Sequence, residues 1–386
     1  MHLDECRQSL PAVPWVWALC LASLAGCSDT IAPAVVPIRF SMISAFQYTT
    51  CGVTNDGAAY CWGSGGNGRL GTGSDTTTLA PQAVAGGHQF ATVTVGEAHA
   101  CGLATTGVAY CWGWNPNGMV GDSSVIDRST PVPVAGNLIF ATLSAGRHHT
   151  CGTTVDGAAY CWGSNDDARL GVGATGDRTT PTRVLSGEHF VAIAAGSRHS
   201  CALTQAGVAY CWGSNFFGQL GDDSTDARTS PARVFGDLAF SSISAGESHT
   251  CALGIGGNAY CWGESRDGEL GNGAPFNLSV PSLVSGGHHF QAVSAGTFES
   301  CGVTTDRQAY CWGQGLSGQL GNDSTVDELD PVRVSGGHRF VQLSTGQDYT
   351  CGVTGAGAGL CWGNNVLGQL GTGTTANSVV PVRVGN

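Results

Sequence analysis

A repeat of 50 residues runs through this chain without a slip, and it constrains the fold more than any other feature. A cysteine pair, a Trp-Gly step and a later proline recur at the same offsets in seven copies. The cysteine pairs are Cys51 and Cys61, Cys101 and Cys111, Cys151 and Cys161, Cys201 and Cys211, Cys251 and Cys261, Cys301 and Cys311, and Cys351 and Cys361. A fixed period of this length is typical of repeat architectures. The sequence therefore predicts one closed or stacked domain.

Each cysteine pair flanks a turn signal. In the first copy the turn is Asn55-Asp56-Gly57, which suits a three-residue hairpin loop with glycine at the left-handed position. Pairing residue 54 with residue 58 then places Cys51 opposite Cys61, at a Cα separation of about 4.5 Å that a disulfide can bridge. Because side chains alternate along a strand, Tyr60 and Trp62 lie on the other face of the hairpin. We expect seven disulfides within hairpins rather than zinc sites, which use shorter cysteine spacings.

The remainder of each copy also predicts strands. Short apolar runs alternate with glycine-rich turns, and no window of eleven residues shows helical spacing. The fourth run carries the recurring proline, such as Pro131, and proline in a sheet belongs on an edge strand. Both faces of each hairpin are apolar and must be covered by neighbouring copies. We therefore predict an all-β domain over residues 40–386 in which seven sheets form a stack or a ring, with one disulfide within each copy. A ring of such sheets is a β-propeller.

Composition argues against nucleic acid as a partner. The formal net charge is −12, no lysine occurs, and the arginines are scattered singly, so the chain lacks a basic stripe for a phosphate backbone. Glycine accounts for 60 of 386 residues, as expected of a turn-rich β protein.

The N-terminal segment indicates export. Residues 14–27 read PWVWALCLASLAGC, an apolar run too short to span a membrane as a stable helix. Leu24-Ala25-Gly26-Cys27 resembles a bacterial lipobox, which implies cleavage before Cys27 and acylation of that cysteine. We predict a lipoprotein-type signal peptide at 1–26, a tether at 27–39, and a protein anchored by lipid in the bacterial cell envelope, facing outside the cytoplasm. Secretion without an anchor is the alternative.

The repeat also resembles a known family. Ala-Gly-x-x-His-[Ser/Thr], then Tyr-x-Trp-Gly-x-Asn-x-x-Gly-Gln-Leu-Gly, then Pro-x-x-Val is similar to the repeats of the regulator of chromosome condensation family, from about residue 40 to residue 386. The resemblance implies a seven-bladed β-propeller whose two chain ends meet. It leaves open whether the ring closes by an exchanged strand or by packing of whole blades.

Activities known in that family match this chain poorly. The nuclear exchange factor carries an inserted wedge, for which the fixed 50-residue step leaves no room. The plant ultraviolet-B receptor needs tryptophan at a step that here reads Gly146-Arg147-His148-His149-Thr150. Secreted bacterial members bind β-lactamases through aromatic-rich loops, which implies a mode of action without naming a target.

Residues that depart from the repeat are our candidates for binding. They follow the Trp-Gly step in different copies and fall on equivalent loops, so a ring would gather them on one rim, where exposed aromatic residues suit a protein interface. The candidates are Trp114, Asn115, Asn117, Phe216, Phe217, Leu316, Val366 and Leu367, with Phe298 and Tyr349 as weaker ones in a second loop. Arg307 is another departure, since the other copies have glycine at that turn position.

Histidine does not point to a metal site. His99, His149, His199 and His249 share one repeat position, but Thr49, Glu299 and Tyr349 fill it elsewhere, so we expect loop hydrogen bonding. We predict a monomeric, non-catalytic propeller without cofactor or metal that binds an unidentified extracytoplasmic protein. The membrane is contacted only through the lipid anchor. Alternatives are a module that binds carbohydrate or cell wall, for which aromatic residues are equally suited, and a propeller-type lyase.

Overall fold

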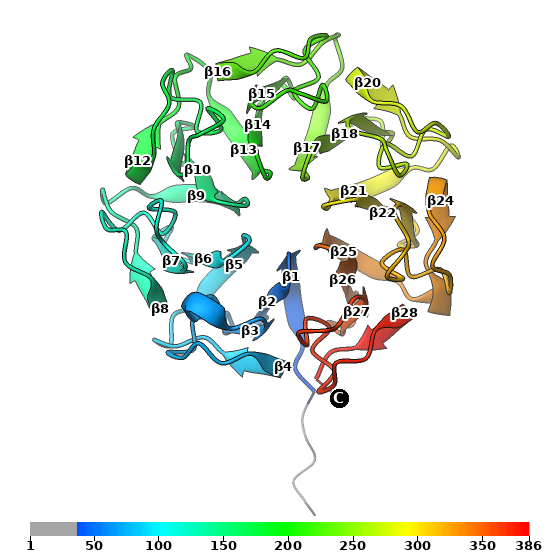
Figure 1. The fold of residues 1–386 in the computed structure, drawn as a ribbon, viewed down its shortest axis with the longest axis horizontal. Coiled ribbons are helices and arrows are strands. Elements are labelled where there is room, and N and C mark those ends of the chain that lie inside the picture. The colour runs from blue at the N-terminus through cyan, green and yellow to red at the C-terminus, as the bar shows by residue number, and fades with distance from the viewer. Residues whose placement is uncertain (1–36, 386) are drawn as a thin grey trace, which may run out of the picture. The chain divides into compact units, whose positions relative to one another are not determined.

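The computed structural model describes residues 37–385, which form a ring of seven four-stranded antiparallel sheets (Figure 1). Each sheet, or blade, uses four consecutive strands in chain order. The predicted signal peptide and the tether up to residue 36 lie outside the described residues. The all-β, seven-bladed prediction is confirmed.

The four strands have constant places in every blade. The innermost strands line the axis and are β1 (Phe40–Phe46), β5 (Phe90–Val95), β9 (Phe140–Ala145), β13 (Phe190–Ala195), β17 (Phe240–Ala245), β21 (Phe290–Ala295) and β25 (Phe340–Thr345). The second strands are β2 (Thr49–Thr54), β6 (His99–Ala104), β10 (His149–Thr154), β14 (His199–Thr204), β18 (His249–Gly254), β22 (Glu299–Thr304) and β26 (Tyr349–Thr354).

The third strands carry the Trp-Gly step, and the fourth strands form the outer edge. The third strands are β3 (Ala59–Gly63), β7 (Ala109–Gly113), β11 (Ala159–Gly163), β15 (Ala209–Gly213), β19 (Ala259–Gly263), β23 (Ala309–Gly313) and β27 (Gly359–Gly363). The fourth strands are β4 (Thr78–Ala83), β8 (Arg128–Pro133), β12 (Arg178–Arg183), β16 (Arg228–Arg233), β20 (Leu278–Leu283), β24 (Glu328–Arg333) and β28 (Ser378–Arg383). Two short 3-10 turns, η1 (Gly66–Gly68) and η2 (Ser335–Gly337), complete the described elements. The recurring proline lies on the edge strands, as predicted.

Hairpin register follows the prediction made from the turn. Cys51 pairs directly with Cys61, and Gly52 with Tyr60. All seven cysteine pairs form disulfides within their own blades, with Cα separations of 4.0 to 4.1 Å. Every one of these sulfurs belongs to a fully buried residue. The disulfides are thus part of the core.

The core is repeated between blades. The disulfide face of one blade packs on the aromatic face of the next, so that Cys51 and Cys61 share a cluster with Phe90 and Trp112. Each tryptophan indole N–H also donates to a backbone carbonyl of the preceding blade, over 2.8 to 3.0 Å. A buried aromatic residue with a satisfied polar atom gives both apolar burial and orientation. This pairing fixes the position of each blade against its neighbour.

The ring closes by packing of whole blades, which resolves the alternatives left open by the sequence. Cys351 and Cys361 of the last blade lie in one cluster with Phe40 and Trp62 of the first. The Phe40 amide donates to the Gly357 carbonyl over 2.8 Å, without any strand being exchanged among the described residues.

Candidate functional site: the loop face

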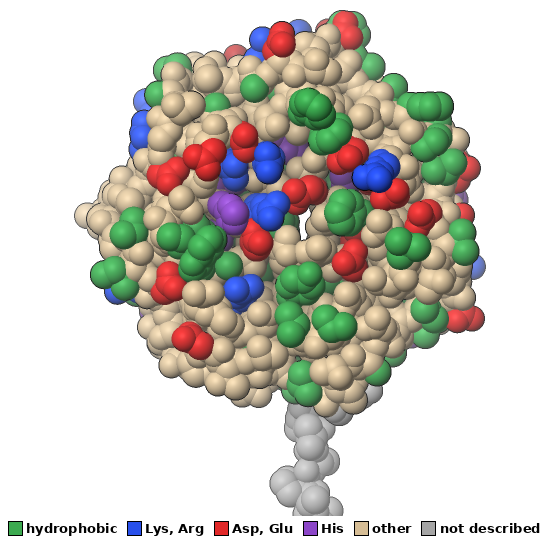
Figure 2. Space-filling view, in the orientation of Figure 1, with side chains coloured by type: hydrophobic (Ala, Val, Ile, Leu, Met, Phe, Trp, Pro, Cys, Tyr) green, Lys and Arg blue, Asp and Glu red, His purple; other side chains and the backbone are tan. Residues whose placement is uncertain are grey.

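The ring has two unlike faces. One carries the connections between first and second strands and between third and fourth strands, and we call it the loop face. The other carries the tight turns between second and third strands and the links from blade to blade, and we call it the turn face. Figure 2 views the loop face, on which both charged and apolar side chains lie around the central opening.

Asn115 holds its loop together and does not face solvent. Asn115 is fully buried. Its side-chain oxygen accepts a hydrogen bond from the Val120 amide over 2.9 Å, and its side-chain nitrogen donates to the carbonyls of Ser124 and Ile126. The equivalent asparagines Asn165, Asn215 and Asn365 make the same contact to the residue five positions later. The interpretation of Asn115 as a binding residue was therefore wrong, because a buried amide is committed to loop hydrogen bonds.

The residue that follows this asparagine position is exposed to solvent at the tip of the loop. Phe216 is 77% exposed, Leu316 is 66% exposed and Val366 is 55% exposed. The same position holds the exposed residues Pro116, Asp166 and Arg266 in other blades. Equivalent loops thus present different side chains in these blades, and three of those side chains are large and apolar. We call Phe216, Leu316 and Val366 the apolar points.

Other candidates are half-buried beside these points. Phe217 packs edge-on against Phe216 with ring centroids 4.9 Å apart. Trp114 lies edge-on to His148 at 5.6 Å. The remaining half-buried candidates are Asn117, Phe298 and Leu367. Asn117 also donates to the Asp177 carboxylate over 2.7 Å, so its amide links two neighbouring loops.

Tyr349 is fully buried, so its assignment to the rim was also wrong. Its hydroxyl donates to the Thr49 carbonyl over 2.7 Å and lies 2.9 Å from the Thr50 hydroxyl, across the joint between the last and first blades. Burial raises the pKa of this phenol above its usual value. Tyr349 therefore serves ring closure rather than binding.

Sequence reasoning missed a charged cluster at the mouth of the central opening. The Arg147 guanidinium donates to Glu97 over 2.7 Å and to Glu247 over 3.2 Å, and His148 contacts the same Glu97 carboxylate at 2.7 Å. Although burial acts to raise the pKa of Glu97, hydrogen bonds from His148 and Arg147 lower it to about 2. Glu97, Arg147 and Glu247 occupy one repeat position, so the same departure from the repeat could have found them.

A cavity of about 310 Å³ adjoins this cluster, lined by Arg147, His148, Asp166, Asp167, Arg169 and Arg198. The buried Arg169 guanidinium donates to the Ser197 carbonyl over 3.0 Å and to the Asp167 carboxylate over 2.5 Å. Both signs of charge line the cavity. The loop face therefore carries paired charges as well as exposed apolar side chains.

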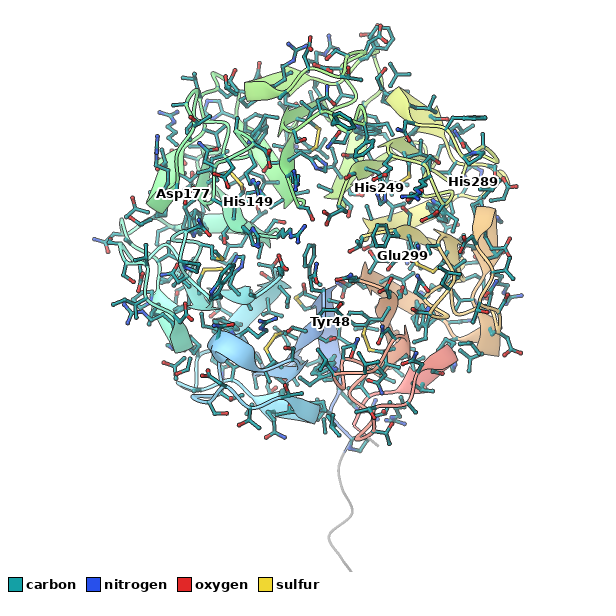
Figure 3. The ribbon with its side chains drawn as sticks, in the orientation of Figure 1. Tyr48, His149, Asp177, His249, His289 and Glu299 are labelled. Atoms are coloured by element: carbon teal, nitrogen blue, oxygen red, sulfur yellow. A yellow bond between two sulfur atoms is a disulfide. The ribbon has the colours of Figure 1, made fainter. Side chains whose placement is uncertain are left out.

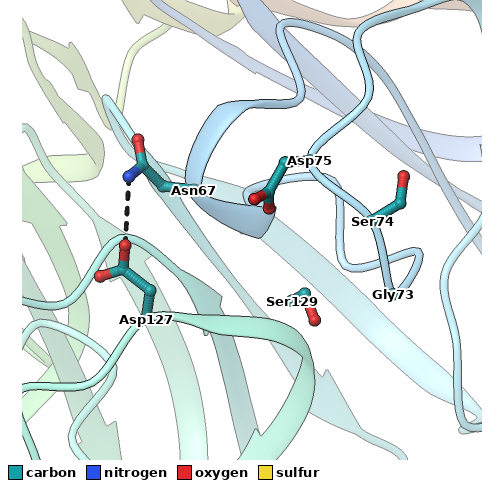
Figure 4. A pocket seen from close by; sticks show the side chains of 6 residues that line it. All are labelled: Asn67, Gly73, Ser74, Asp75, Asp127 and Ser129. Carbon is teal, nitrogen blue, oxygen red and sulfur yellow. Dashed lines mark hydrogen bonds between the residues drawn. The ribbon is translucent and has the colours of Figure 1, made fainter.

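Two further hollows in the ring have similar volumes. One of about 300 Å³ lies between the loops of the first two blades, where Asn67 donates to Asp127 over 3.1 Å beside Asp75 and Ser74 (Figure 4). Another of about 310 Å³ lies on the axis against the inner strands β1, β5, β9 and β25. No group of three or more histidine, cysteine or acidic side chains suited to a metal ion occurs within residues 37–385.

The repeated histidines form hydrogen bonds between blades, from the first residue of each second strand, whereas the sequence predicted hydrogen bonds within loops. The Nε2 atoms of His99, His149, His199 and His249 lie 2.8 to 2.9 Å from the hydroxyls of Thr150, Ser200, Thr250 and Ser300. Burial lowers the pKa of His99 and His199 to about 3 and that of His249 to about 4. These histidines are neutral and lie below the surface, as His149 and His249 do in Figure 3.

Glu299 fills the same position and is fully buried. One of its carboxylate oxygens accepts from the Phe298 amide over 3.2 Å, and the other has no partner. Burial and the nearby Asp348 carboxylate raise its pKa well above the usual value. Burial of this side chain therefore favours the protonated carboxyl over the carboxylate.

Comparison with known protein families shows to which family this chain belongs. The regulator of chromosome condensation (RCC1) repeat matches residues 56–103, 156–203, 206–253, 256–303 and 306–353. A second description of the same repeat matches residues 90–118, 140–168, 190–219, 240–269 and 290–319. The chain belongs to the RCC1 repeat family. No curated protein sequence matches the chain significantly.

Solved structures agree with the family. Human WBSCR16 matches with a TM-score of 0.78 and 19% identity, over 85% of this chain and 94% of that chain. Prp20p from Saccharomyces cerevisiae, described with its binding to Gsp1p and histones, matches with a TM-score of 0.76 and 20% identity, over 90% and 88%. The ectodomain of the receptor kinase ACR4 from Arabidopsis thaliana gives 0.54 and 22%, over 87% and 98%. At these identities the likeness shows the fold. No described helix is long and apolar enough to span a membrane.

Proposed function

We propose that this RCC1-repeat propeller is exported, anchored by lipid at Cys27, and binds a protein partner through its loop face. The observation that carries the proposal is the exposure of Phe216, Leu316 and Val366 at one repeat position, on loops whose other repeated residues are buried. Large exposed apolar side chains beside a charged cluster are typical of protein interfaces. Binding by relatives supports the class of partner, since Prp20p is described as binding proteins.

Export is supported by the cysteines. Fourteen of the seventeen cysteines form buried disulfides, and such bonds are typical of oxidising compartments. The ACR4 match shows that this fold also serves as an ectodomain. Both observations agree with the lipobox-like residues that end at Cys27.

The test is capture of partners on intact envelopes. A variant with Phe216→Ala, Leu316→Ala and Val366→Ala should lose the partner that the unchanged protein recovers after cross-linking. The matched control replaces Val155, Leu185 and Ile255, three exposed apolar residues of the turn face and outer wall, by alanine. The control should keep the partner.

Recovery of the same partner by both variants would exclude the loop face as the binding surface. If the loop-face variant loses binding to purified cell-wall glycan rather than to a protein, the result would favour the carbohydrate-binding alternative. Apolar side chains also pack on sugar rings.

A further inference from the structure

The turn face differs from the loop face in its charge. Most acidic residues lie on the loop face, whereas five exposed arginines gather at the turn face around the last two blades and the first. We call this the basic patch, and it consists of Arg39, Arg307, Arg333, Arg339 and Arg383. We propose that the basic patch holds the turn face of the propeller against the anionic phospholipid headgroups of the membrane that carries the lipid anchor. The proposal rests on the anchored state proposed above.

Contacts in the structure connect three of the five arginines. The Arg339 guanidinium donates to the Asp306 carbonyl over 2.7 Å, at the turn that presents Arg307. Arg307 in turn reaches toward the next blade, where its guanidinium lies 3.1 Å from the position of a β-carbon on Gly355. Arg39 donates to the Ala356 carbonyl over 2.6 Å from the other side. The side chains of Arg39 and Arg307 therefore meet around one uncharged turn, Gly355-Ala356-Gly357. Arg339 joins this turn through its backbone carbonyl, which accepts from the Gly355 amide over 3.2 Å.

Arg307 is held in a conformation that its residue type disfavours. Its φ is +66°, and the other six blades have glycine at that position. A residue kept in a sparsely populated region costs stability and is often explained by function. The exposed position of Arg307 at the tip of this turn is explained if its charge is used by a ligand outside the ring.

The chain enters the propeller beside the patch. Pro37 is exposed, and Arg39 precedes β1 directly at the turn-face end of that strand. Cys27 lies ten residues before Pro37, and ten residues span at most about 35 Å when fully extended. An acyl chain on Cys27 therefore keeps the basic patch within a short distance of the bilayer surface.

The acidic loop face does not cancel this attraction. A six-residue strand separates the two faces by roughly 20 Å, whereas charges are screened over about 8 Å at physiological ionic strength. Among residues 37–385, the side-chain carboxylates within the patch are those of Asp56 and Asp306, fewer than the arginines. Basic side chains beside a lipid anchor are a known means of strengthening attachment to anionic membranes.

Hydrogen exchange of the full acylated protein in vesicles tests the proposal. We expect the amides of turns 305–308 and 355–358 to exchange more slowly in vesicles containing phosphatidylglycerol than in neutral phosphatidylcholine vesicles. The slowing should be at least about fivefold, which is the factor expected from the attraction between one arginine and an anionic surface. It should vanish in high salt, which screens that attraction. A variant with Arg39→Gln, Arg307→Gly and Arg339→Gln should lose it.

The matched control removes three arginines from the loop-face side, through Arg178→Gln, Arg198→Gln and Arg266→Gln, and should keep the protection. Equal exchange in the two lipids, or equal loss of protection in both variants, would overturn the proposal. Unchanged exchange in the strands shows that each variant is folded. Mass spectrometry of the N-terminal peptide from the same sample reports acylation, so failure of the anchor is seen separately from failure of the patch.

Discussion

The glycine after each buried leucine shows how tightly single residues are constrained. Gly221 has a φ of +67°, and a β-carbon there would lie 2.6 Å from Nε1 of Trp262 in the next blade. The left-handed backbone and the close indole both exclude a side chain. Because the indole N–H is committed to the Gln219 carbonyl, the ring cannot move away without breaking that bond.

Gly221→Ala should therefore lower the free energy of unfolding by more than about 2 kcal/mol, through backbone strain and overpacking. Gly236→Ala is the control, since Gly236 also has a positive φ but open space around it. Urea unfolding of the two variants measures the difference. Equal losses of unfolding free energy in the two variants would show that the contact with Trp262 makes no contribution to the cost.

Arg307 adopts a positive φ at the turn position where the other blades have glycine. Arg307→Gly should raise the free energy of unfolding by less than about 1 kcal/mol, because glycine relieves the strain while giving more freedom to the unfolded chain. Thermal melting checks the sign. No change, or a lower melting temperature, would contradict this account of the turn.

Glu299 gives a prediction for pH. Its folded-state pKa lies well above the unfolded value near 4.5, so ionisation disfavours the folded state as pH rises above 4.5. Glu299→Gln should therefore raise the melting temperature at pH 8 and have little effect at pH 4. The four buried histidines act oppositely, because their lowered pKa values remove stability as pH falls below about 6.5. A gain from Glu299→Gln that is as large at pH 4 as at pH 8 would exclude carboxyl ionisation as its cause.

At the scale of the strands, hydroxyl groups join the inner strands into a ring. Side-chain oxygens of Ser44, Thr94, Ser144, Ser244, Ser294 and Ser344 accept from backbone amides of the following blades over 2.9 to 3.2 Å. The fourth blade has Ala194 at this position, so the Ala245 amide lacks the acceptor that the equivalent amides have.

Ala194→Ser should complete this ring and raise the free energy of unfolding by about 1 kcal/mol, the usual net value of one hydrogen bond. Ala192→Ser, on the same strand, is the control and should give no gain. Equal effects of the two substitutions in urea unfolding would show that the missing acceptor has no cost.

Elements were predictable from the sequence where their causes are local. The turn Asn55-Asp56-Gly57 fixes the hairpin register, and the register fixes the disulfide. The hydroxyl ring and the Arg147 cluster depend on residues 50 or 100 positions apart that meet only once the blades are assembled. For the same reason the burial of Asn115 and Tyr349 was missed, since loop packing and the closing joint decide it.

At the scale of the whole molecule, seven equivalent blades give one rigid ring with two different faces. The repeated residues make contacts within and between blades. The loop-tip residues that differ between blades are therefore free to form a surface. The loop face carries the apolar points Phe216, Leu316 and Val366, and the turn face carries the basic patch. A lipid anchor at the turn face would present the loop face away from the membrane.

These proposals depend on the chain being exported from the cytoplasm. They also depend on its folding as a propeller in which one disulfide joins the two cysteines of each blade. Mass spectrometry of the protein isolated from its native envelope, without reduction, tests that claim most directly. The account predicts an acylated N-terminus at Cys27 and seven disulfides that each join the two cysteines of one blade. Free thiols at the paired positions, or an N-terminus that still carries residues 1–26, would contradict it.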